Sequence, residues 1–73
     1  MKPLVLADEV AVLSRRQFEV LKAAAYGLGV KETAKELGIG IDSVKTHREA
    51  IRNKMVASNI TEAVAMACRA GLL

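Results

Sequence analysis

The chain has 73 residues, a length that admits a single small domain. Apolar residues make up 52% of it, which argues against disorder, and its one cysteine excludes an internal disulfide and suits a reducing compartment. Eleven Lys and Arg against eight Asp and Glu give a net charge of +3, too small an excess to require nucleic acid by itself. The apolar stretch 4–13 is too short to span a bilayer and lacks a clean signal-peptide core, so we expect a cytoplasmic protein without membrane contact.

The first predicted element is a helix that starts after Ser14. Residues 1–12 are interpreted as an arm or linker, and 13–73 as the domain. Ser14 and Gln17 have the spacing of a capping box, and Leu13 precedes the cap as in a hydrophobic staple. Gly27 then predicts the end of the helix near residue 26.

Three further helices are expected over 31–37, 41–55 and 61–70, with Thr61 and Glu62 as the cap of the last one. A short turn with two glycines joins the second and third helices. Two helices joined so tightly can cross steeply and leave the outer face of the second one free. No strand-like alternation occurs, so the sequence predicts an all-α four-helix bundle that contains a helix-turn-helix.

The third predicted helix has two contrasting faces. Val44, Ile51 and Met55 form an apolar stripe, with the single histidine, His47, at its edge. The opposite arc is polar and consists of Asp42, Lys45, Thr46, Glu49 and Asn53. A solvated face supported by a Lys45–Glu49 pair is one interpretation, and a helix that enters the DNA major groove is the one we favour.

The side chains of this arc predict definite roles in DNA. Lys45 can donate to guanine, Thr46 can contact either edge of a base pair, and Glu49 can accept from a cytosine amino group. Phosphate contacts are expected from residues near helix ends, namely Lys31, Ser43 and Arg52. One histidine and one distant cysteine are too few for a metal site, and no nucleophile, base and orienting group occur together, so neither a cofactor nor an enzyme is expected.

From Leu13 onward the sequence resembles the LuxR/FixJ/GerE-type DNA-binding domain. Four segments carry the resemblance: Leu13 to Leu21; Lys31-Glu32-Thr33-Ala34 with Leu37 and Ile39; Ser43-Val44-Lys45-Thr46-His47 with Ile51 and Lys54-Met55; and Asn59, Thr61 to Val64 and Gly71-Leu72-Leu73. They cover about four fifths of the chain, in order and with the family's spacing.

The resemblance implies that the third helix enters the major groove and that the fourth forms a two-fold dimer. It matches Lys45, Thr46 and Glu49 to base-reading positions, and Lys31, Ser43 and Arg52 to phosphate contacts. The pairing surface would be formed by Ile60, Ala63, Val64, Ala67 and Cys68. The fourth helix is apolar nearly all round, which suits either a dimer or simple packing in its own core.

Several positions depart from the family pattern. Gly29 and Gly40 replace the usual capping side chains, at a cost of about a few tenths of a kcal/mol each. Val56-Ala57 stands where Gly-Val is usual, Ile60 where an arginine is common, and the acid Glu49 is unusual at its position. We expect these changes to leave the fold intact, and the acid at Glu49 to weaken the general attraction to DNA.

The function expected from these observations is a transcriptional regulator that binds a two-fold site in double-stranded DNA as a homodimer. One alternative is a protein-binding antagonist that docks on a full-length regulator of this type through the fourth helix and blocks its dimerisation or DNA binding. Another is a sigma-factor region-four-like domain that also meets RNA polymerase, against which Val44-Lys45-Thr46-His47 argues. The sequence leaves open whether the chain is a whole protein or an excised domain.

Overall fold

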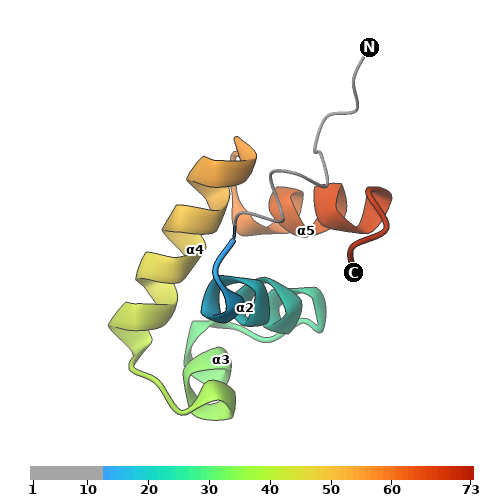
Figure 1. The fold of residues 1–73 in the computed structure, drawn as a ribbon. Coiled ribbons are helices and arrows are strands. Elements are labelled where there is room, and N and C mark those ends of the chain that lie inside the picture. Colours follow the sequence, from blue (N-terminus) through green and yellow to red (C-terminus); the bar gives the residue numbers. More distant parts are fainter. Residues whose placement is uncertain (1–12) are drawn as a thin grey trace.

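The computed structural model describes residues 13–73, so the predicted arm over 1–12 lies outside the described residues. Four helices follow one another along the chain: α2 (Arg15–Ala25), α3 (Val30–Leu37), α4 (Ile41–Met55) and α5 (Ile60–Arg69). Helix α2 packs against each of the other three, with α3 near the start of α4 and α5 near its end (Figure 1). The described part of the chain contains no strand, and the prediction of an all-α helix-turn-helix fold is confirmed.

The core is built around the inner stripe of α4. Val44 and Ile51 are fully buried and Met55 is 1% exposed, as the apolar spacing of this helix predicts. Burying a side chain of this size is worth roughly 1.5–3 kcal/mol, so the stripe fixes which face of α4 points outward. All four helices and the loop before α5 contribute to the cluster, which consists of Val20, Leu21, Ala34, Val44, Ile51, Met55, Ala57, Ala63 and Ala67.

Helix α2 begins at the predicted capping box. The Ser14 hydroxyl accepts from the Gln17 amide at 3.0 Å, and Gln17 Oε1 accepts from the Ser14 amide at the same distance. Leu13 and Phe18 both pack against the core beside this cap. The helix ends at Ala25, and Gly27 follows in the left-handed region with φ +87°.

The turn between α3 and α4 depends on two glycines. Gly38 closes α3 with φ +69°, a conformation that other residues adopt only with strain. Gly40 caps α4 without a side-chain acceptor, so no side chain caps the first amides of this helix. Helix α4 spans the predicted residues, whereas α3 begins one residue earlier than predicted because Glu32 reaches back to the Gly29 amide, 2.7 Å away.

Helix α5 begins one residue before its predicted start, and its predicted cap is wrong. The helix spans Ile60–Arg69, and its cap is Asn59, whose side chain accepts from the Glu62 amide at 2.8 Å. Thr61 therefore lies inside the first turn and does not cap it.

The Ser58 amide donates to Glu62 at 2.6 Å and holds the pKa of this exposed carboxyl below its usual value. The stability that this hydrogen bond gives to the folded state is therefore lost as pH falls through that lowered pKa. No helix within residues 13–73 is both long enough and apolar enough to cross a bilayer.

Thr33 is a buried polar residue that offers a test of this packing. It is fully buried on α3, and its hydroxyl has no hydrogen-bond partner within the described structure. An unsatisfied buried hydroxyl costs about 1–3 kcal/mol, so the isosteric Thr33→Val should raise the free energy of unfolding by about that amount. Urea denaturation followed by circular dichroism measures the change. The matched variant Thr46→Val, on the exposed face of α4, should alter stability by less than about 0.5 kcal/mol. A loss of stability in Thr33→Val would show that the hydroxyl has a partner.

Val56 closes α4 in an unfavourable conformation. Its φ of +54° lies in the left-handed region, where the β-branched side chain is crowded by its own backbone, and it is 82% exposed, so packing does not repay the strain. Val56→Gly should stabilise the fold by about 1–2 kcal/mol, with Val56→Asn in between. Thermal unfolding of the wild type, Val56→Gly and Val56→Asn gives the order of their stabilities. Val56→Ala removes the β-branch but keeps a Cβ, so it separates the strain of branching from the strain of the positive φ. A glycine variant no more stable than the parent would contradict the strain.

Candidate nucleic-acid interface

The outward arc of α4 is continuous and polar. Every predicted member of it is exposed: Asp42, Lys45, Thr46, Glu49 and Asn53. Since the opposite stripe is buried to 1% exposure or less, the division of this helix into two faces is confirmed. The exposed surface has the diameter that fits a DNA major groove and carries donors and acceptors.

The base-reading candidates differ in how they are engaged. Lys45 and Thr46 are exposed neighbours in the first half of α4, and no ion pair involves Lys45 within residues 13–73. The Lys45–Glu49 pair of the alternative interpretation does not form, because Glu49 pairs instead with Arg52, one turn toward the helix end. Both partners stand at helical neighbour spacing from Glu49, and the sequence alone does not choose between them.

The phosphate candidates lie at opposite ends of the helix-turn-helix. Lys31 is exposed in the first turn of α3, and Ser43 is exposed in the first turn of α4, beside the amides that no side chain caps. Such amides attract phosphate oxygens. Arg52 is at the other end of α4, where its Nη1 donates weakly to the Ala57 carbonyl at 3.5 Å.

One connection to α4 escaped the sequence analysis. Lys54 Nζ donates to Gln17 Oε1 at 3.0 Å, and the same oxygen serves the capping box of α2. The last turn of α4 is thereby tied to the first turn of α2. The two residues are 37 positions apart, so no local pattern could have indicated the contact.

His47, as predicted, and Arg48 lie at the edges of the buried stripe, and both are half-buried. Arg48 Nη2 donates to the Leu28 carbonyl at 3.4 Å and so links α4 to the loop between α2 and α3, whereas its Nε is buried without a partner. Across residues 13–73 no three His, Cys, Asp or Glu residues gather into a group that could hold a metal ion.

The predicted pairing surface of α5 needs a correction. Ala63 and Ala67 are fully buried in the core of the single chain, so they have no surface to offer a second copy. Ile60 and Val64 are half-buried and pack partly on the same core, and Cys68 is exposed. Small apolar residues suit a core and a helix interface equally, which is why the sequence did not separate them.

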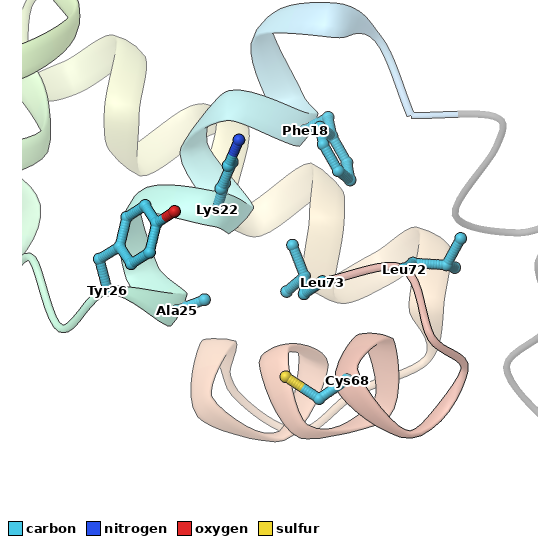
Figure 2. A pocket seen from close by; sticks show the side chains of 7 residues that line it. All are labelled: Phe18, Lys22, Ala25, Tyr26, Cys68, Leu72 and Leu73. Carbon is cyan, nitrogen blue, oxygen red and sulfur yellow. The ribbon is translucent and has the colours of Figure 1, made fainter.

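Cys68 also borders a hollow of about 320 Å³ on the side of the bundle that α5 and α2 share (Figure 2). Its walls come from α2, α5 and the C-terminal residues, and none from α4: Phe18, Lys22, Ala25, Tyr26, Cys68, Leu72 and Leu73. Tyr26, at its rim, is 74% exposed. The hollow is thus separate from the polar arc of α4.

Comparison with known proteins agrees with this geometry. The family described as bacterial regulatory proteins, luxR family, matches residues 11–67. The chain is 38% identical over 68 residues to the uncharacterized transcriptional regulatory protein YxjL of Bacillus subtilis, covering 92% of this chain and 31% of that protein. It is 35% identical to the transcriptional regulatory protein FixJ of Bradyrhizobium diazoefficiens, covering 93% of this chain and 33% of FixJ.

Comparison of the fold with solved structures also identifies a similarity to FixJ. A crystal structure of full-length FixJ from B. japonicum superposes with a TM-score of 0.81 at 36% identity, over 92% of this chain and 33% of that one. The chain therefore spans about a third of the length of these relatives. It belongs to the luxR family of bacterial regulatory proteins and has the fold of their LuxR-type helix-turn-helix DNA-binding domain.

Proposed function

We propose that this chain binds a two-fold site in double-stranded DNA as a homodimer, with α4 in the major groove, and regulates transcription from it. The observation that carries the proposal is the polar arc of α4, which is exposed along its whole length while the opposite stripe is buried to 1% or less. Because the buried stripe of α4 packs in the core, the helix has a fixed orientation and presents the same side chains to solvent. The proposed function is that of a DNA-binding protein and not of an enzyme. A cytoplasmic location is proposed with it.

Lys45 and Thr46 are proposed to read base edges, because both are exposed in the half of α4 nearest the turn. Lys31 and Ser43 are proposed to hold phosphates from the first turns of α3 and α4, and at the start of α4 the amides that no side chain caps add to the attraction. Arg52 lies at the far end of α4, where its pairing with Glu49 limits the phosphate contact that it can make.

Dimerisation is proposed to use the outer side of α5. With Ala63 and Ala67 turned inward, the surface available to a second copy is formed by Cys68 and the exposed parts of Ile60 and Val64. Two-fold pairing of this surface would place two copies of α4 on successive major grooves. Contacts with another regulator or with RNA polymerase would use surfaces other than the arc of α4.

Lys45→Ala tests the groove assignment. Loss of a good base contact should weaken binding to a selected duplex by about 1–3 kcal/mol, which is roughly 5- to 150-fold in Kd. The duplex comes from selection with the wild-type protein out of a random library, and fluorescence anisotropy gives the affinities. The matched control is Lys35→Ala, which removes the same charge from an exposed position on α3 outside the proposed interface. Equal affinities of the Lys45→Ala and Lys35→Ala variants would contradict the assignment of Lys45. If the folded wild-type protein enriches no duplex in the selection, the alternative function is favoured, an antagonist that docks on another regulator.

Cys68→Glu tests the pairing surface. A carboxylate buried in an interface without a partner costs several kcal/mol, so the variant should be monomeric at concentrations where the wild type is dimeric. Sedimentation equilibrium over a range of concentrations measures the change. Lys35→Glu supplies the control, since it introduces the same side chain on α3. A Cys68→Glu protein that still dimerises would place the interface elsewhere.

A further inference from the structure

Arg52 is held in place by two contacts from its own end of α4. Its Nη2 is paired with the Glu49 carboxylate, and its Nη1 donates to the Ala57 carbonyl at 3.5 Å. Because two different nitrogens are engaged, the plane of the guanidinium is restrained as well as its position. We call this arrangement of Glu49, Arg52 and the Ala57 carbonyl the Arg52 clamp.

The backbone after α4 makes the clamp possible. Val56 turns the chain through the left-handed region, and the Ala57 amide then donates to the Arg52 carbonyl at 2.9 Å. This turn folds Ala57 back over the last turn of the helix, where its own carbonyl meets the guanidinium. Glu49 stands three residues before Arg52, on the adjoining surface of the same helix.

The clamp changes what each side chain offers to DNA. The Arg52 side chain is only 34% exposed, and its charge is cancelled by a carboxylate whose side chain is 58% exposed and faces the same solvent. A phosphate that approaches Arg52 therefore meets the Glu49 carboxylate as well. At least one oxygen of that carboxylate is already engaged by a protein donor, which leaves less of it for a base.

We infer that Glu49 is a positioning residue, which restrains Arg52 and cancels its charge and so weakens sequence-independent attraction to DNA without reading a base. The inference rests on the proposed function, and it reassigns Glu49 from the base-reading role that the sequence analysis gave it. Sequence-independent binding comes from cations that neutralise phosphates, and each neutralised phosphate steepens the salt dependence. A clamped Arg52 contributes little to that term.

Glu49→Gln is the variant that tests the clamp, because it keeps the shape of the side chain and removes its charge. Its binding to a random duplex and to the selected duplex should tighten together, with a salt slope steeper by about one unit, so that the gain falls roughly three- to fourfold between 50 and 200 mM salt. The base preference obtained by selection should stay that of the wild type. A preference altered at one base pair would return Glu49 to base reading and overturn the inference.

Two controls separate the clamp from a simple change of net charge. Asp42→Asn removes one negative charge from the exposed first turn of the same helix, where residues 13–73 provide no ion pair for it. Glu49→Gln should exceed Asp42→Asn in the wild-type background and match it in an Arg52→Met background. Equal effects of the two in the wild-type background would show that only net charge matters, and would overturn the inference.

The clamp is also testable without DNA. Nitrogen-15 NMR of the guanidinium should show slowed rotation for Arg52 in the wild type and free rotation in Glu49→Gln. Free rotation in the wild type would overturn the clamp even if DNA binding is confirmed. Restrained rotation in a protein that binds no duplex, with or without the substitution, would instead refute the proposed function and the role inferred for Glu49 together.

Discussion

Burial of one face of α4 is the constraint on which the rest of the molecule depends. Val44, Ile51 and Met55 enter a core to which all four helices contribute, and a small domain of this kind has no second core to compensate for their loss. The fully buried stripe determines the rotation of α4 about its own axis. Because side chains on a helix keep fixed angles to one another, the same burial determines which residues face outward. The interface is therefore a consequence of the core.

The ends of α4 are fixed in different ways, and the difference has consequences for its chemistry. At the start, Gly38 and Gly40 form the turn without a capping side chain, so the first amides have no side-chain partner. At the other end Lys54 donates to Gln17 and ties the helix to α2, and Arg52 contacts the Ala57 carbonyl more weakly. An uncapped helix start suits a site for anions.

Sequence patterns predicted the parts of this structure that depend on local spacing. The limits of α4, its two faces and the capping box at Ser14 are all determined within a few residues, and they agree with the structure. The patterns failed where two partners or two environments were equally compatible. Glu49 has a basic residue at neighbour spacing on each side, and Ala63 suits a core as well as an interface. The bond between Gln17 and Lys54 depends on the tertiary fold alone.

The Val56 turn illustrates how a locally unfavourable residue can be retained in a stable fold. A β-branched residue at φ +54° opposes the local preference of the chain, yet the turn it makes brings Ala57 into the core at 5% exposure. Burial of Ala57 and the bond from its amide to Arg52 then offset part of the strain. The same turn supplies the carbonyl that restrains Arg52. The end of the helix therefore couples core packing to the charge that α4 presents.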